Sequence, residues 1–296
     1  MTWLIVGTKG QLSRALRLVL EEANIEFYSL GSSELDIRIN DLCMNKITEL
    51  KPSVIINAAA WTNVDSAEVD PVGANAVNNL GAKNLALAAK AIGAIFLHIS
   101  TDYVFSDTSS EPRKELDSLS PNCVYGNTKA AGETSVLSEY GDKSFIFRTA
   151  WLYSQWGNNF VKTMTRLAIF GKEEVRVVVD QVGQPTSVFD LANQIVETVR
   201  AKLPFGIYHA SNSGQGSRFD CAFEVFKLCE ATTSRLVPIE TKELAQLAKR
   251  PAFSVLSHDG WNVVGASGIR VAPMREWKAS LHDLMPAIIN SVRSEE

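Results

Sequence analysis

Cysteine is scarce in this chain, and its four cysteines show no pattern that carries chemistry. Cys43, Cys123, Cys221 and Cys229 form neither a CxxC pair nor a compact disulfide framework. Such spacing is typical of reduced thiols in the cytosol and argues against a disulfide-stabilised secreted domain. The four histidines also lack the spacing of a metal site, so we expect no metal ligands among them.

Runs of basic residues and long apolar stretches are missing as well. The formal net charge is −4 and no basic run occurs, which argues against nucleic acid or an anionic membrane as a partner. No apolar stretch reaches the length of a membrane span. The first residues, MTWLIVG, lack a basic stretch and predict a strand, not a signal peptide. We therefore expect a soluble, cytoplasmic protein.

What the chain does contain is a regular alternation of short apolar stretches and helix-like segments. The stretches WLIVG, IEFYSL, SVIINAAA, AIFLHIS and SFIFRTA are separated by amphipathic segments, one of which predicts a long helix over 71–93. This pattern indicates a parallel sheet covered by helices on both faces, the α/β class with a Rossmann-like doubly wound sheet. Further helices are predicted at 125–140, 188–201, 219–231 and 275–292.

A glycine-rich turn joins the first strand to the first helix. Gly7 and Gly10 let backbone N–H groups approach a pyrophosphate at the helix N-terminus, where the dipole favours anions. Ser13 replaces the third glycine of a GxxGxxG pattern, and an ordinary strand–helix turn is the competing interpretation. The second strand is followed by neither the Asp nor the Arg that would decide between NADH and NADPH.

Tyr125 and Lys129 are the most informative pair. Four residues apart on a predicted helix, they share one face. A nearby ammonium lowers the pKa of a phenol, which can then donate a proton to a carbonyl. The pair alone is a weak signal, but it follows the polar strand end ISTDYVF, at the edge where open α/β sheets bind ligands.

These motifs together resemble the extended short-chain dehydrogenases, and within them the dTDP-4-dehydrorhamnose reductase family. The similar segments cover nearly the whole chain. They are GxxGQ at 7–11, LDI at 35–37, NAAAWTNVDxxE at 57–68, STDYVF at 100–105, YGxxKxxGE at 125–133, FRTAW at 147–151, GNNF at 157–160, DQxxQPT at 180–186, GxxH at 206–209 and RP at 250–251.

The resemblance implies a catalytic set of Thr101, Tyr125 and Lys129. Tyr125 would protonate the carbonyl oxygen as hydride arrives, Lys129 would bind the nicotinamide ribose and lower the tyrosine pKa, and Thr101 would hydrogen-bond the carbonyl. The implied cofactor is NADPH, with NADH left open. Besides Tyr125 and Lys129, its implied ligands are Gly7, Gly10, Gln11, Leu12, Asp36, Ile37, Ala58, Ala59 and Ala60.

The resemblance also implies residues that bind the sugar nucleotide: Thr62, Val64, Asp102, Tyr103, Trp151, Asn159 and Arg250. Plainer roles compete at several of these positions. Trp151 would serve core packing, Asn159 would cap a helix, Asp102 would cap a loop, and Arg250 would be a surface charge. Tyr103 stands where related dehydratases carry an acidic residue, which favours simple reduction over elimination.

The function implied is NAD(P)H-dependent reduction of the 4-keto group of a nucleotide-activated deoxysugar. The best match is dTDP-4-dehydro-L-rhamnose to dTDP-L-rhamnose, a step of dTDP-rhamnose and polysaccharide biosynthesis. Residues 1–150 would form the dinucleotide-binding domain, completed by a returning segment near 187–208. Residues 151–296 would mainly form a smaller α/β substrate-binding domain. Family members also admit a homodimer with Mg²⁺ at its contact, although no acidic cluster here indicates a metal.

Three departures from the family pattern keep alternatives open. They are Ser13 in the glycine turn, Arg218 where an aromatic residue usually opens a helix, and Phe253 in place of an asparagine. The last two lie in the substrate half, so a related 4-ketoreductase or epimerase with another sugar is one alternative. A non-catalytic regulatory subunit of the same fold is another, although the intact Thr101, Tyr125 and Lys129 argue against it.

Overall fold

The computed structural model describes residues 2–105 and 110–295, and a six-stranded parallel sheet forms its centre. The strand order is β10-β5-β4-β3-β1-β2. The bounds are β1 Trp3–Val6, β2 Phe27–Leu30, β3 Val54–Asn57, β4 Ile95–Thr101, β5 Ser144–Thr149 and β10 Gly206–His209. The order reverses between β1 and β3, and open α/β sheets bind ligands at the carboxyl ends of the strands there. The predicted Rossmann-like fold is confirmed.

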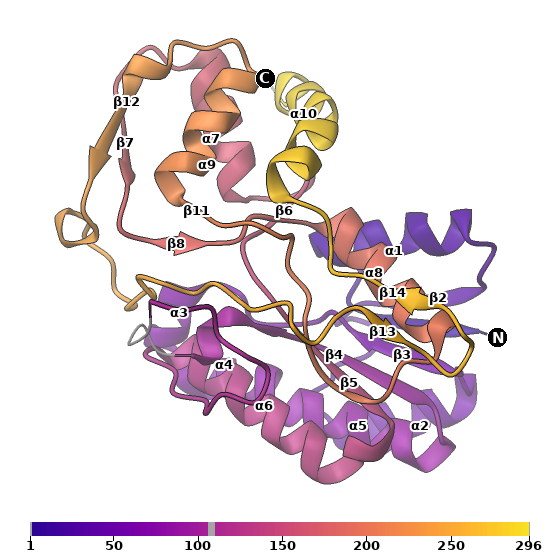
Figure 1. Ribbon diagram of the computed structural model, residues 1–296. Coiled ribbons are helices and arrows are strands. Elements are labelled where there is room, and N and C mark those ends of the chain that lie inside the picture. Colours follow the sequence, from indigo (N-terminus) through magenta and orange to yellow (C-terminus); the bar gives the residue numbers. More distant parts are fainter. Residues whose placement is uncertain (1, 106–109, 296) are drawn as a thin grey trace.

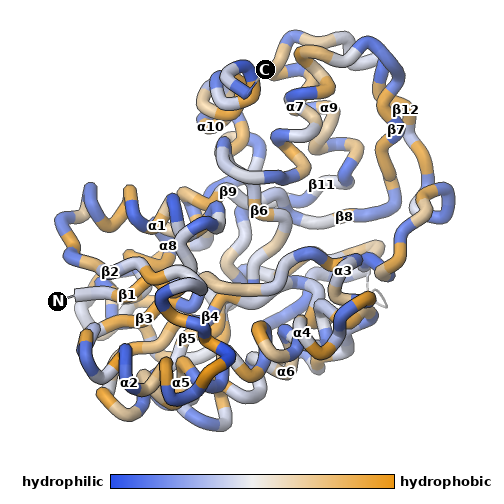
Figure 2. The backbone as a smooth tube through the Cα atoms, turned by 180° about the vertical axis from the view of Figure 1, so that it is seen from behind, coloured by the Kyte–Doolittle hydropathy of each residue, from blue (hydrophilic) through white to orange (hydrophobic). Residues whose placement is uncertain are grey.

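Helices cover both faces of this sheet, as Figures 1 and 2 show from opposite sides. One face carries α1 (Gln11–Glu22) and α8 (Val188–Ala201), and the other carries α2 (Asn40–Leu50), α5 (Ala82–Ile92) and α6 (Val124–Tyr140). Successive strand residues point to opposite faces. Ile5 and Ile56 therefore enter the core under α1 and α8, whereas Leu4 and Ile55 enter the core on the other face. Continuous apolar strands supply both cores.

Segments from late in the chain return to this sheet. Strand β10 pairs in parallel with β5, and α8 packs along α1. The hairpin of β13 (Val263–Val264) and β14 (Arg270–Val271) contacts α8, and Trp261 and Met274 join the same core. Residues well beyond 150 thus bury apolar surface against the first helix.

A second helical region stands beside the sheet (Figure 1). Its apolar core joins α7 (Phe160–Phe170), α9 (Arg218–Leu228) and α10 (Trp277–Arg293). Its strands pair only in twos: β7 (Val175–Val178) with β12 (Leu236–Ile239), β8 (Val182–Gly183) with β11 (Gly216–Ser217), and β6 (Leu152–Tyr153) with β9 (Thr186–Ser187). Long connections between these short pairs carry side chains toward the sheet.

Two predicted helices differ from the structure. The single helix over 71–93 is divided into α4 (Pro71–Asn75), a π-helical turn η1 (Ala76–Gly81) and α5. At η1 the chain packs so tightly on α6 that a Cβ on Gly132 would lie 2.3 Å from the Asn78 carbonyl oxygen. The helix predicted at 219–231 ends at Leu228, because Glu230 takes a left-handed conformation with φ of 55°. Within the described ranges, no helix is both long and apolar enough to cross a bilayer.

Candidate active site

A cleft of about 510 Å³ opens between the carboxyl ends of β1, β3 and β4 and the second helical region. It brings together residues that were predicted to be catalytic, to bind the cofactor or to bind the sugar nucleotide. Those that line it are Gly10, Gln11, Leu12, Ala58, Ala59, Ala60, Thr62, Val64, Thr101, Asp102, Tyr103, Tyr125, Lys129, Trp151 and Asn159. Residues that are distant in the sequence thus share one hollow, at the edge of the sheet where the fold places ligands.

Tyr125 lies in the first turn of α6 and lines the cleft together with Thr101. The close approach depends on Gly126, where a Cβ would lie 2.2 Å from the carbonyl oxygen of Tyr103. The Thr101 hydroxyl in turn donates to Oδ1 of Asp102 at 2.9 Å. The tyrosine, the threonine and the carboxylate thus share one wall of the cleft, and the threonine hydroxyl is hydrogen-bonded to the carboxylate.

The predicted lowering of the Tyr125 pKa by Lys129 is wrong for the protein alone. Burial raises the pKa of Tyr125, and the hydrogen bond with Thr101 offsets only part of that effect. Removal from water penalises the phenolate, and the nearby charge of Asp102 raises the pKa further. The phenol therefore stays protonated at neutral pH, which is the form that a proton donor requires.

Lys129, one turn after Tyr125 on α6, is buried and contacts the backbone of Ile99 and the ring of His98. Its ammonium donates to the carbonyl oxygen of Ile99 at 2.5 Å and lies 3.3 Å from Nε2 of His98. Burial lowers the pKa of Lys129 to about 8, although the charge of Glu133 acts in the opposite direction. Burial and the charge of Lys129 also lower the pKa of His98, so the imidazole is neutral, and its other ring nitrogen lies 3.1 Å from the amide nitrogen of Asn57. Sequence reasoning missed this contact with His98.

The glycine turn presents an uncapped helix N-terminus to the cleft. Gly7 has φ of +105°, and a Cβ there would lie 3.3 Å from backbone atoms of Ala58 and Ala59. Gly10, at the N-cap of α1, provides no side-chain cap, and the first turn has no acidic residue. Ser13 is fully buried behind the turn. The free N–H groups and the helix dipole suit an anionic group such as a pyrophosphate.

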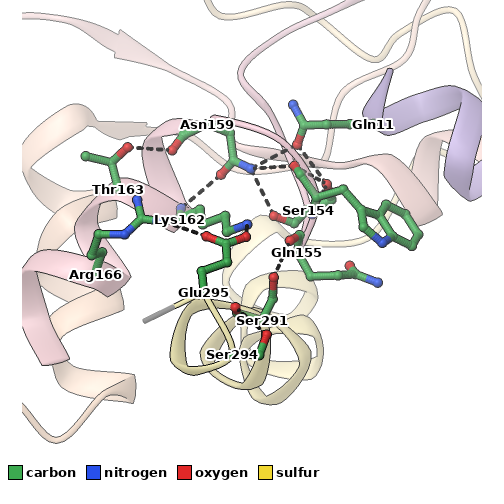
Figure 3. Close-up of polar contacts among 11 residues, drawn as sticks. Gln11, Ser154, Gln155, Asn159, Lys162, Thr163, Arg166, Ser291, Ser294 and Glu295 are labelled. Atoms are coloured by element: carbon green, nitrogen blue, oxygen red, sulfur yellow. Dashed lines mark hydrogen bonds and ion pairs between the residues drawn. The ribbon is translucent and has the colours of Figure 1, made fainter. Parts of the chain in front are cut away.

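Gln11 links this turn to the second helical region, as Figure 3 shows. Its Oε1 accepts hydrogen bonds from Ser154 at 2.8 Å and from Nδ2 of Asn159 at 2.9 Å. Oδ1 of Asn159 accepts from the backbone of Lys162 and caps α7. Asn159 therefore acts as a helix cap, as the plainer interpretation expects, and at the same time lines the cleft.

Aromatic side chains also line the cleft. Tyr103 meets Tyr125 edge-on, with ring centroids 5.6 Å apart. Trp151 has φ of 45°, a conformation that non-glycine residues rarely adopt and that clusters at functional sites. The guanidinium of Arg218 covers one face of its indole at 3.6 Å. Sequence reasoning noted Arg218 only as a departure from the family pattern; its opening position on a predicted helix was the available signal.

Four predicted site residues do not line the cleft, and their predicted roles stay predictions. Asp36 forms an ion pair with Arg38 at 2.6 Å, which lowers the Asp36 pKa, and Ile37 packs on Gly81. Gly7 belongs to the glycine turn but packs on the backbone of Ala58 and Ala59. Arg250 pairs with Asp65 at 2.6 Å and lines a separate hollow.

Comparisons with known proteins agree with this geometry. The model of the family described as RmlD substrate binding domain matches residues 1–289. A dTDP-4-dehydrorhamnose reductase of Streptomyces griseus is 41% identical over 290 residues, covering 97% of this chain and 93% of that protein. A dTDP-4-keto-6-deoxy-D-glucose reductase of Streptomyces niveus is 37% identical over 286 residues, covering 97% of each.

A solved structure shows the same likeness in three dimensions. The dTDP-4-dehydrorhamnose reductase of Bacillus anthracis in complex with NADP matches with a TM-score of 0.90 and 36% identity, over 96% of this chain and 98% of that one. The match therefore extends over both the sheet and the second helical region. This chain belongs to the RmlD substrate binding domain family of extended short-chain dehydrogenases.

Proposed function

We propose that this chain reduces the 4-keto group of a nucleotide-activated deoxysugar with NADPH, converting dTDP-4-dehydro-L-rhamnose into dTDP-L-rhamnose. The observation that carries the proposal is that Thr101, Tyr125 and the buried Lys129 line one cleft together with the glycine turn. A protonated phenol, a neighbouring hydroxyl and a fixed cation are the groups that a carbonyl reduction uses. The relatives that carry this activity in their names support the choice of sugar.

The residues at the cleft fit a nicotinamide dinucleotide. The uncapped N-terminus of α1 suits the pyrophosphate, and Ala58 to Ala60 leave room for a ribose at the end of β3. When bound, the cofactor supplies the hydride. The proposal places it with residues 1–150 and the returning segment near 187–208, and places the sugar nucleotide mainly with residues 151–296.

The chain itself supplies orientation and the proton. Thr101 and Tyr125 hold the keto oxygen between two hydroxyls, and Tyr125 transfers its proton to that oxygen as negative charge develops there. In the protein alone the Thr101 hydroxyl donates to Asp102, and on substrate binding it turns to donate to the keto oxygen instead. Lys129, held by the Ile99 carbonyl one turn after Tyr125, supplies a positive charge that would stabilise the phenolate that proton transfer leaves.

A direct assay tests the proposal. Oxidation of NADPH and of NADH is followed spectrophotometrically with dTDP-4-dehydro-L-rhamnose, and the product stereochemistry is assigned by NMR. We expect turnover and a product with the configuration of L-rhamnose. Turnover of other 4-keto sugars alone would contradict the choice of substrate, and an inverted centre elsewhere in the ring would indicate an epimerase.

Reduction of another dTDP-4-keto sugar is the second candidate. The 37% identity to the reductase from Streptomyces niveus and the departures at Arg218 and Phe253 favour it. A regulatory subunit is disfavoured, because Thr101, Tyr125 and Lys129 meet in one cleft. In the described part of the chain, no group of three or more His, Cys, Asp or Glu side chains is arranged so that it could hold a metal ion. The homodimer, its Mg²⁺ and a cytoplasmic location stay predictions.

A further inference from the structure

The side-chain amide of Gln11 is held by the protein at its oxygen only. Its Oε1 accepts from the Ser154 hydroxyl at 2.8 Å and from Nδ2 of Asn159 at 2.9 Å. Among residues 2–105 and 110–295, Nε2 of Gln11 has no acceptor, and it is not buried. Figure 3 shows this nitrogen on the side of the amide that faces away from Asn159. Because Gln11 lines the cleft, its NH₂ group is a donor that a ligand there can reach.

Asn159 determines which atom of the Gln11 amide faces it. Oδ1 of Asn159 accepts from the backbone N–H of Lys162 at 2.9 Å, as the cap of α7. Nδ2 of Asn159 therefore lies on the other side, where it donates to Gln11 and to the carbonyl oxygen of Ser154, both at 2.9 Å. An amide nitrogen only donates, so the atom of Gln11 that meets it is the oxygen. A rotated Gln11 amide would place two NH₂ groups against each other.

The Ser154 hydroxyl does not impose that orientation by itself. A hydroxyl both donates and accepts, so it accommodates either end of an amide. With Gln11 rotated, the Ser154 hydroxyl would accept from Nε2 and donate to the carbonyl oxygen of Trp156, which lies 3.1 Å away. The choice between the two ends of the Gln11 amide therefore rests with Asn159.

The position of Gln11 indicates which acceptor its NH₂ group meets. Gln11 is the first residue of α1 and directly follows Gly10, the N-cap. This helix end has no side-chain cap and no acidic residue in its first turn, so it favours an anion. A side-chain donor at the same place adds a hydrogen bond to a phosphate oxygen, and such bonds to charged acceptors are strong.

We propose that Asn159 is a positioning residue for the dinucleotide, which holds the Gln11 amide so that Nε2 donates to the pyrophosphate. This inference rests on the proposed function. It gives Asn159, which was predicted to bind the sugar nucleotide, a role at the cofactor instead. Asn159 belongs to the second helical region, so that region completes the pyrophosphate site of the glycine turn.

Isothermal titration calorimetry with NADP⁺ tests the inference in a double-mutant cycle. Gln11→Met removes the amide and should weaken NADP⁺ binding about tenfold, the usual cost of one hydrogen bond to a charged group. Asn159→Asp still caps α7, because Asp and Asn are equally good caps. Its carboxylate only accepts, so it turns Nε2 of Gln11 toward itself. In that background Gln11→Met should weaken NADP⁺ binding by less than about twofold.

Repulsion between the new carboxylate and NADP⁺ is common to both proteins that carry Asn159→Asp, so it cancels in the cycle. Asn159→Ser provides a neutral cap with a shorter side chain. It leaves the Gln11 amide free to take either orientation, so NADP⁺ binding should weaken about twofold. Urea unfolding checks that both variants keep the stability of the wild type.

The matched control is Asn63→Asp, the same change at the exposed N-cap of α3. In that background Gln11→Met should keep its full tenfold effect. An equal cost of Gln11→Met in the wild type and in Asn159→Asp would overturn the role of Asn159. Weaker binding of dTDP-L-rhamnose with unchanged NADP⁺ binding in Gln11→Met would place the amide at the sugar nucleotide and overturn the inference as well.

The two proposals fail separately. NADP⁺ affinities that follow the cycle, without turnover of any keto sugar, would refute the proposed reduction and leave the role of Asn159. Turnover of the keto sugar with equal costs of Gln11→Met in both backgrounds would do the reverse.

Discussion

Lys129 and Glu133 lie one turn apart on α6, both face β4 and both are buried, yet their surroundings differ. Glu133 makes a two-pronged pair with Arg148, at 3.0 and 2.7 Å, and also accepts from Ser100. Lys129 has no carboxylate within ion-pair distance in the described ranges; a backbone carbonyl accepts its hydrogen bond, and the imidazole of His98 lies 3.3 Å away. The pair with Arg148 neutralises the charge of Glu133 and serves stability. Lys129 has no such partner, so its charge stays available for chemistry.

The largest effect should come from the phenol above Lys129. Tyr125→Phe should lower turnover by about a hundredfold or more, because a positioned proton donor contributes that much, and should leave NADPH binding nearly unchanged. Steady-state kinetics and NADPH fluorescence titration measure the two quantities. Tyr140→Phe, at the far end of the same helix, is the control and should retain full activity. Undiminished turnover in Tyr125→Phe would remove the tyrosine from the mechanism.

Substitution of Glu133, in the neutralised pair with Arg148, should instead lower the stability of the fold. Glu133→Gln leaves the Arg148 guanidinium buried without a counter-charge, and breaking such a pair costs about 3 kcal/mol or more of unfolding free energy. Urea unfolding measures the loss. Glu49→Gln, which breaks the surface pair with Lys46, should change stability by less than about 1 kcal/mol. Equal losses in the two variants would mean that the buried pair contributes no more than a surface pair.

Alternation along β4 explains what sequence reasoning could and could not predict here. Spacing placed Tyr125 and Lys129 on one helix face, and apolar patterning located the six strands of the sheet. His98 and Ser100 share a face of β4 by the same alternation, and Lys129 and Glu133 share a face of α6. Their pairing requires knowing that α6 covers that face of β4, which follows from the tertiary packing.

The substrate half was less predictable for a physical reason. Its strands pair only in twos, so long connections set the positions of side chains, and spacing carries little information about them. Arg250 thus pairs with Asp65 outside the cleft, although the family pattern placed it at the substrate. Arg218 lies inside the cleft because α9 begins there; the sequence indicated that it opens a helix, but not where that helix begins in space.

The available charge of Lys129 should appear in the pH dependence of the rate. Because the Lys129 pKa is lowered to about 8, kcat/KM should fall about tenfold per pH unit above that value. Burial raises the Tyr125 pKa, so the phenol itself stays protonated through this range. A rate that stays flat to pH 10 would mean that the charge of Lys129 is not required.

The contribution of Lys129 to the free energy of unfolding should rise with pH above about 8, whereas the rate falls. The unfolded chain holds the Lys129 proton up to its ordinary pKa of 10.5, and the folded chain releases it near 8. Between these values the unfolded state binds more protons, so this lysine makes the fold more stable as pH rises. Unfolding therefore does not explain the loss of rate. Urea titrations at pH 8 and pH 10, with Lys129→Met as the reference, check whether the free energy of unfolding rises with pH as expected.

The smallest effect should come from the imidazole that holds Lys129. If the tautomer leaves Nε2 of His98 free to accept, His98→Leu removes an acceptor from the ammonium, and a hydrogen bond to a charged group contributes roughly 1.5 kcal/mol. The alkaline limb of kcat/KM should therefore move about one pH unit lower, because one pKa unit corresponds to about 1.4 kcal/mol. His98→Gln retains an acceptor oxygen and should keep the limb near its wild-type position. If both variants leave the limb unchanged, the Ile99 carbonyl alone sets the Lys129 pKa, and the imidazole serves the packing of β4 against α6. A shift in the leucine variant alone would make His98 the residue that keeps this unpaired charge usable at neutral pH.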